Sequence, residues 1–127
     1  MDLIGPFDGF LGFSQGASMT HLLVALKQLK KGLCAVNGIR FIIVFSAFKS
    51  LSSVHQELNE VKIVDVPSFH VYGLTDEIVD ASRSQELANL FDKAVVLSHA
   101  GKHCIPPIGL FKNELKHFLS ANQLLKR

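Results

Sequence analysis

Several residue types that would direct a fold or a location are scarce in this chain. Its 127 residues include no tryptophan, one tyrosine, two cysteines and four prolines. Cys34 and Cys104 form neither a C-x-x-C pair nor a metal-like pairing with histidine, which indicates free thiols in a reducing compartment. The longest aliphatic run, around Phe41 to Phe45, is far too short to span a membrane.

Charge is scarce as well. Only 19% of the residues are charged, and the formal net charge is +2. The one local basic cluster, Lys27, Lys30 and Lys31, is better explained as the basic end of a helix than as a phosphate-binding patch. We therefore expect neither nucleic acid nor a membrane among the partners. The N-terminus carries Asp2 and no basic segment, so we expect a soluble protein of the cytoplasm, or of the nucleus as well.

Apolar residues, in contrast, make up 48% of the chain, enough for the core of a single domain over residues 1–127. Four short apolar segments alternate with helical or loop segments, and we expect strands at 7–13, 39–46, 68–72 and 94–98. This alternation predicts an α/β fold, a doubly wound, mostly parallel sheet of about four strands with flanking helices. The second segment is apolar on successive residues and should be covered on both faces.

The expected helices have recognisable ends. The first covers residues 17–29 and stops at Gly32. A short helix is expected around residues 54–58, and another begins with Ser82 as N-cap and Gln85 at its third position. The last helix follows two prolines, and its apolar residues recur at helical spacing at 110, 111, 115, 118 and 119.

The most informative motif lies between the first strand and the first helix. The run Gly12-Phe13-Ser14-Gln15-Gly16 has the pattern G-x-S-x-G of a nucleophile elbow. In an elbow, a strained strand-to-helix turn exposes a serine hydroxyl at the carboxyl edge of a parallel sheet. We expect Gly12 and Gly16 to be required because the strand and the helix approach too closely there for a Cβ.

A serine nucleophile also needs a base, and a third group that orients the base. Asp76 lies just past the third expected strand and His103 just past the fourth. Because the carboxyl ends of parallel strands meet at one edge of a sheet, Ser14, Asp76 and His103 are expected to converge.

Neighbouring residues offer rival assignments. Glu77 and Asp80 share the loop with Asp76, but Asp76 is nearest the strand end. His99 competes with His103, and we expect it instead to shape the loop. The thiol of Cys104 is either reactive or, as we prefer, a small apolar support for that loop.

The remaining histidines suggest no site. His70 lies inside a strand and is predicted to be a hydrogen-bonded core residue. His21, His55 and His117 are expected on helix surfaces or in packing. Their spacing indicates no metal site, and we expect no cofactor.

Four stretches carry a resemblance to a known family. They are GPFDGFLGFSQGA at 5–17, FSAFKS at 45–50, VPSFHVYGLTD at 66–76 and HAGKHCIPP at 99–107. In this order the chain resembles the serine hydrolases of the family that includes the fungal serine hydrolases and the ovarian-cancer-gene-2 esterases, a branch of the α/β-hydrolases. The resemblance implies hydrolysis of carboxylic esters, with Ser14 as nucleophile, Asp76 as orienting acid and His103 as base.

The chain departs from the family pattern in two ways. Lys102 stands where the family usually has a glycine before the histidine, so the loop is less free to turn. The pattern also begins well upstream of Met1, and the upstream part supplies one oxyanion donor beside the backbone N–H of Gln15. We therefore expect the carboxyl-terminal portion of an α/β-hydrolase fold, with weak activity. Strand 7–13 would then be an aromatic sheet edge, which favours self-association.

Three functions come into question for this chain. The first is a serine esterase that acts on a small-molecule ester, or a thioester, through an acyl-enzyme. The second is a catalytically impaired relative with a binding or regulatory role. The third is a nucleotide-binding domain that uses Gly9 and Gly12, but their spacing fits neither G-x-G-x-x-G nor a P-loop. We prefer the first.

Overall fold

Four parallel strands form the centre of the fold in the computed structural model, which describes residues 9–29, 40–64 and 66–122. The strands lie in chain order, and every neighbouring pair is parallel. They are β1 (Gly9–Phe13), β2 (Phe41–Phe45), β3 (Ser68–Gly73) and β4 (Ala94–His99). The predicted parallel sheet is therefore confirmed. The predicted strand residues 7, 8 and 39 lie outside the described residues.

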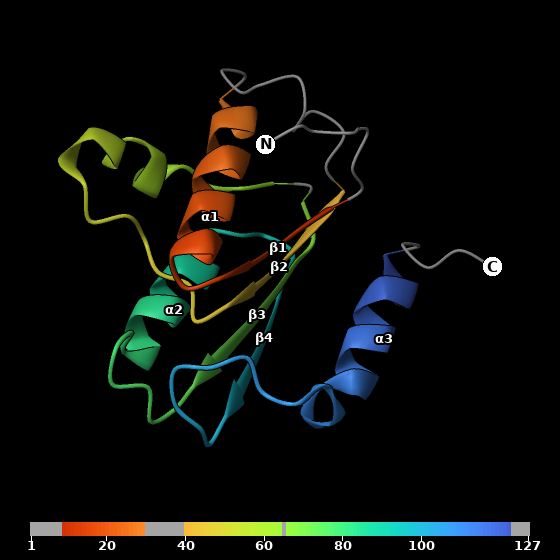
Figure 1. Cartoon of the computed structure of the whole chain (residues 1–127). Helices are drawn as coiled ribbons and strands as arrows, with labels where there is room; N and C mark the ends of the chain where they lie inside the picture. Colours follow the sequence, from red (N-terminus) through yellow and green to blue (C-terminus); the bar gives the residue numbers. More distant parts are fainter. Residues whose placement is uncertain (1–8, 30–39, 65, 123–127) are drawn as a thin grey trace, which may run out of the picture.

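Helices cover both faces of this sheet. They are α1 (Gln15–Gln28), α2 (Ala81–Ala88) and α3 (Lys112–Ala121). Figure 1 shows α1 and α2 on one side of the strands and α3 on the other. The doubly wound arrangement predicted from the sequence is thus confirmed, because each face of the sheet buries its own apolar cluster.

β2 shows why the two clusters form. Its residues Ile42 and Val44 belong to the cluster under α1 and α2, whereas Ile43 and Phe45 belong to the cluster under α3. Successive side chains of a strand point to opposite faces, so a strand without polar residues must be covered twice. On the α3 side, Phe69 contacts both Phe111 and Phe118 of that cluster, with ring centroids 6.2 and 5.3 Å away.

Two helix predictions were wrong, one in its N-terminal boundary and one in its type of helix. The N-cap of α2 is Asp80 and not Ser82, because Asp80 Oδ1 accepts hydrogen bonds from the backbone N–H and the hydroxyl of Ser82, at 2.9 and 2.7 Å. The short helix expected around residues 54–58 is instead a pair of 3-10 turns, at Ser53–His55 and Leu58–Glu60.

The prediction for the last helix is confirmed in part, and that for the end of the first helix is not tested. In the last helix, Phe111 and Phe118 are buried as expected, but Leu110 lies in a preceding 3-10 turn and is 65% exposed. The predicted end of the first helix at Gly32 lies outside the described residues.

β1 is one of the two outer strands of the sheet that the described residues form, and β4 is the other. β1 carries no charged side chain, and Leu11 at its centre is 64% exposed. Within residues 9–29, 40–64 and 66–122, no helix combines the length and the apolar character needed to cross a bilayer.

Candidate active site

Ser14 occupies a strained turn between β1 and α1. Its backbone has φ 55 and ψ −114, in a region that L-residues rarely adopt. The N–H of Ser14 donates to the carbonyl oxygen of Phe45 at 2.9 Å, so the turn is fixed to the end of β2. The hydroxyl is thereby held at the carboxyl edge of the sheet.

The two glycines of the motif differ in what they do. A Cβ added at Gly12 would lie 2.6 Å from the carbonyl oxygen of Gly16, so no larger residue fits there. The expectation that a Cβ would not fit was wrong for Gly16. A Cβ added at that position meets nothing within 4 Å, because it points away from β1 into open space. Gly16 takes part in the close approach through its backbone alone.

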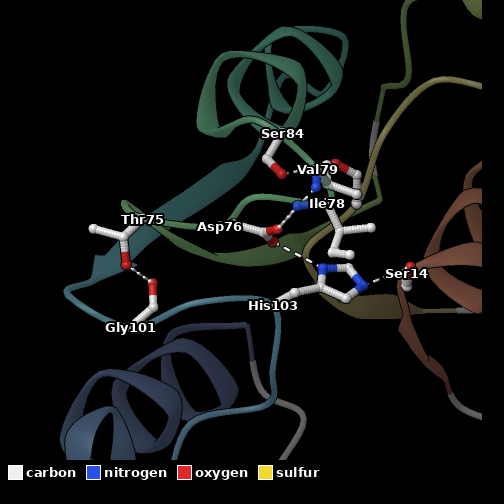
Figure 2. A network of polar contacts seen from close by, with 9 residues as sticks. Ser14, Thr75, Asp76, Ile78, Val79, Ser84, Gly101 and His103 are labelled. Atoms are coloured by element: carbon white, nitrogen blue, oxygen red, sulfur yellow. Dashed lines mark hydrogen bonds and ion pairs between the residues drawn. The ribbon is translucent and has the colours of Figure 1, made fainter.

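His103 connects Ser14 with Asp76 (Figure 2). The Nε2 atom of His103 lies 3.0 Å from Ser14 Oγ, and its Nδ1 atom lies 2.8 Å from Asp76 Oδ2. An ionised carboxylate only accepts hydrogen bonds, so Nδ1 carries the hydrogen and the Nε2 lone pair faces the serine hydroxyl. The structure therefore brings together the three side chains that the sequence placed at this edge.

Asp76 is held from its other side by the backbone. Its Oδ1 atom accepts hydrogen bonds from the N–H groups of Ile78 and Val79, both at 2.8 Å (Figure 2). Burial alone would raise the pKa of Asp76, but the hydrogen bonds from Val79, His103 and Ile78 outweigh it and lower this pKa. The carboxylate is consequently ionised at neutral pH.

The loops that carry Asp76 and His103 are joined to each other. The hydroxyl of Thr75 donates to the carbonyl oxygens of Ala100 and Gly101, at 3.0 and 2.9 Å, and the latter contact is drawn in Figure 2. The N–H of Leu74 donates to the carbonyl oxygen of His99 at 2.8 Å. His99 Nδ1 accepts from the N–H of Gly101 at 3.0 Å, so His99 shapes the loop as expected.

The rival residues have other partners. Glu77 is exposed and lies 3.8 Å from Lys102, and Asp80 caps α2. Cys104 is exposed, so the expectation that it supports the loop from within was wrong. His70 is buried as predicted, and its Nε2 atom lies 2.8 Å from Ser68 Oγ. Its Nδ1 atom, however, has no hydrogen-bond partner among the described residues.

The helix that follows Ser14 offers a donor for negative charge. Gln15 is the first residue of α1, and the first N–H groups of a helix have no intrahelical acceptor. The N-terminus of a helix also favours anions through its dipole. The Gln15 N–H is therefore available to an oxyanion that forms on a carbonyl attacked by Ser14.

A cavity of about 520 Å³ opens beside the serine. Its lining residues come from the β1–α1 turn, the segment after β2, the loop after β3 and the first turn of α2. They are Phe13, Ser14, Gln15, Phe48, Leu51, Ile78, Val79 and Arg83. The ring of Phe13 lies 4.9 Å from that of His103. The sequence reasoning did not single out Phe13, Phe48 or Arg83 as part of the site, because no motif connects these residues to Ser14.

No metal centre is evident in the described part of the chain. Within residues 9–29, 40–64 and 66–122, no group of three or more His, Cys, Asp and Glu residues is arranged to hold a metal ion.

Known proteins share this fold. The esterase domain of a Rhodothermus marinus protein superposes with a TM-score of 0.63 at 13% identity, over 90% of this chain and 60% of that chain. Acyl-protein thioesterase 2 of Zea mays superposes with a TM-score of 0.60 at 18% identity, over 90% of this chain and 55% of that chain. The described residues thus form part of an α/β-hydrolase fold.

Sequence comparison then gives the family. Residues 1–115 match the family described as Serine hydrolase (FSH1). Esterase C25G4.2 of Caenorhabditis elegans is 47% identical over 116 residues, which are 91% of this chain and 52% of that protein. Esterase OVCA2 of Danio rerio is 37% identical over 120 residues, 94% of this chain and 52% of that protein. The chain belongs to the FSH1 serine hydrolase family, and it spans about half the length of these relatives.

Proposed function

We propose that this chain carries the catalytic centre of a carboxylic ester hydrolase that works through an acyl-enzyme. One observation supports the proposal above all others. Ser14, on a strained turn at the N-terminus of α1, lies within hydrogen-bond distance of an imidazole that is itself oriented by a buried carboxylate. Family membership and the names of the relatives point to the same class of reaction.

The reaction starts with proton transfer. His103 Nε2 accepts the Ser14 proton as Ser14 Oγ attacks the ester carbonyl, and Asp76 stabilises the imidazolium that forms. The carbonyl oxygen becomes an oxyanion, which the Gln15 N–H binds. Collapse of the intermediate breaks the C–O bond of the ester, His103 protonates the departing alcohol, and Ser14 is left acylated. Water then attacks the acyl-serine while His103 accepts one of its protons. His103 returns this proton to Ser14 Oγ as the acyl–oxygen bond breaks, and the acid is released.

The Gln15 N–H is the oxyanion donor that we assign among the described residues. A single oxyanion donor typically contributes about 10²–10³-fold to turnover. A thioester, whose leaving group departs more readily, is a second substrate of the same chemistry.

Covalent labelling tests the proposal. A fluorophosphonate probe, which reacts with activated serines, should label the wild-type protein at Ser14 and fail to label Ser14→Ala. Ser46→Ala is a matched control, because Ser46 is 1% exposed and its hydroxyl has no partner among the described residues. It should remain labelled. Folded wild-type protein that resists the probe would instead indicate the catalytically impaired relative.

We also propose that the chain self-associates through β1. An outer strand presents unpaired backbone groups, and β1 lacks the charges and the proline that commonly protect such edges. Light scattering coupled to size-exclusion chromatography should show a mass that rises with concentration, and Leu11→Lys should lower it. A constant monomer mass in the wild-type protein would overturn this second proposal.

A further inference from the structure

A cation lies in the wall of the cavity that contains Ser14. Arg83, in the first turn of α2, lines this cavity together with Phe48 and Leu51. Its Nη2 atom is buried and has no hydrogen-bond partner among the residues that the structure describes. The described residues therefore leave the hydrogen bonding of this guanidinium incomplete, and a cation in a cavity wall attracts a ligand that brings a charged acceptor. The planar fork of a guanidinium fits a carboxylate particularly well.

The guanidinium is held in place before any ligand arrives. Its Cζ atom lies 4.8 Å from the centroid of the Phe48 ring, which is a cation–π contact. The backbone N–H of Arg83 donates to the carbonyl oxygen of Asp80 at 2.9 Å, which fixes the first turn of α2. A donor held in this way loses little conformational freedom when a ligand binds.

The neighbouring carboxylates have other partners or are in solvent. Arg83 also lines an adjoining cavity of about 380 Å³ that includes Lys49, Glu60 and Glu86. Glu86 lies 3.1 Å from Lys49, and Glu60 is exposed, where water and salt screen its charge. Asp80 interacts electrostatically with Arg83 but uses its Oδ1 atom to cap α2. The cavity beside Ser14 therefore has a cationic wall.

We propose that this cavity accepts esters whose acyl chain ends in a carboxylate, that is, hemiesters of dicarboxylic acids, with Arg83 binding the terminal carboxylate. The inference rests on the proposed function, because it assigns the acyl chain of the same hydrolysis. The side chains of Phe48, Leu51 and Ile78 give the cavity apolar walls for the methylene chain. The terminal carboxylate is unchanged by the reaction.

A matched pair of substrates tests the acyl assignment. 4-Nitrophenyl adipate monoester and 4-nitrophenyl hexanoate share leaving group and chain length and differ in the terminal carboxylate. The adipate should have a kcat/KM roughly tenfold higher, as expected for a charge-assisted hydrogen bond. This ratio should fall to about one in Arg83→Gln and be partly retained in Arg83→Lys. A ratio near one in the wild-type protein, or an unchanged ratio in Arg83→Gln, overturns the inference.

Two further measurements complete the test. Lys116→Gln removes the same charge from an exposed position on α3, on the other face of the sheet, and should keep the ratio. 4-Carboxyphenyl hexanoate and phenyl hexanoate place the carboxylate on the alcohol side. A preference for the carboxylate in that pair alone, lost in Arg83→Gln, would overturn the acyl-side assignment.

Binding without turnover separates this inference from the proposed function. In the Ser14→Ala protein, an NMR titration should show monomethyl adipate binding roughly tenfold more tightly than methyl hexanoate, and Arg83→Gln should remove the difference. If the wild-type protein hydrolyses no ester, the proposed function fails, but this titration still decides the role of Arg83. Equal binding of the two ligands would overturn it.

Discussion

Two serines follow neighbouring strands with nearly the same backbone φ, yet only Ser14 lies beside an imidazole. Ser14 has φ 55 and Ser46 has φ 53, the two positive values among the described non-glycine residues. Each N–H donates to the next strand, Ser14 to Phe45 at 2.9 Å and Ser46 to Val71 at 2.8 Å. Ser14 Oγ, however, has a histidine nitrogen 3.0 Å away, whereas Ser46 is 1% exposed and its hydroxyl has no hydrogen-bond partner among the described residues. A strained turn is therefore insufficient for a nucleophile, which also needs access and a base.

His103 and His21 differ in the same two respects, access to solvent and hydrogen-bond partners. His103 has a partner on each ring nitrogen and is partly accessible. His21 is fully buried, and neither of its ring nitrogens has a partner among the described residues. Burial, with a smaller contribution from the charge of Lys49, lowers the pKa of His21 to about 4. The same side chain thus acts as a candidate base at the sheet edge and as a neutral ring in the core.

The largest effect is expected when His103 loses its orienting carboxylate. Asp76→Asn keeps the shape but removes the ionised acceptor, so the imidazole is no longer held in the productive tautomer. We expect the rate of ester hydrolysis to fall by about 10⁴-fold. Asp80→Asn is the matched control, since asparagine also caps a helix, and it should change the rate little. Equal losses in the two variants would contradict the role given to Asp76.

The two glycines of the Ser14 turn should respond oppositely to alanine. Gly12→Ala forces a Cβ against the Gly16 carbonyl, and we expect a loss of about 3 kcal/mol or more in the free energy of unfolding. Gly16→Ala meets open space inside a helix, so it should be neutral or stabilising by up to about 1 kcal/mol. Urea denaturation measures both. A destabilised Gly16→Ala would show that the two glycines have the same steric role.

Acid should destabilise the protein through its buried histidines. Burial, followed by the charge of His21, lowers the pKa of His70 to about 3, and that of His21 falls to about 4. Both groups have an ordinary pKa of 6.5. Above that pH both rings are neutral in either state, and the full stability is present. As the pH falls below it, the unfolded chain binds protons that the folded chain resists, so stability falls until the folded-state pKa values are reached.

The loss due to His21 should reach the order of 3 kcal/mol as the pH falls to about 4, the folded-state pKa. Urea denaturation at neutral and at mildly acid pH should show part of it, and His21→Leu should reduce the difference. His117→Leu, at an exposed position of α3, is the control and should leave the difference intact. A pH dependence that is the same in all three proteins would exclude the buried ring as its source.

The smallest effect is expected at Ser46. Removing its hydroxyl takes away a buried polar group that has no partner among the described residues, so Ser46→Ala should change the free energy of unfolding by less than about 1 kcal/mol. Thermal denaturation checks this. A loss of several kcal/mol would reveal a partner for the hydroxyl and weaken the contrast with Ser14.

The strands and the position of the site were predictable from the sequence for two reasons. Continuous apolar runs such as β2 allow few structures other than a strand covered on both faces. Parallel strands also bring the residues after their carboxyl ends to one edge, which is why Ser14, Asp76 and His103 were found although they are far apart in the chain.

Other features were not predictable because they depend on packing. Asp80 and Ser82 both suit an N-cap, and the path of the chain from β3 decides between them. The positive φ of Ser46 has no marker in its neighbours. The unpaired Nη2 of Arg83 depends on how α2 approaches the segment after β2, and no local pattern records that approach.

The hydrogen bonds between the loops after β3 and β4 have a consequence for how the site is assembled. Thr75, Leu74 and Gly101 join the two loops, and His103 and Asp76 are carried by them. The base and its orienting acid are therefore held to each other by hydrogen bonds within residues 74–103, and the ring of Phe13 in β1 packs beside the imidazole. What the turn after β1 adds to this pair is the hydroxyl of Ser14.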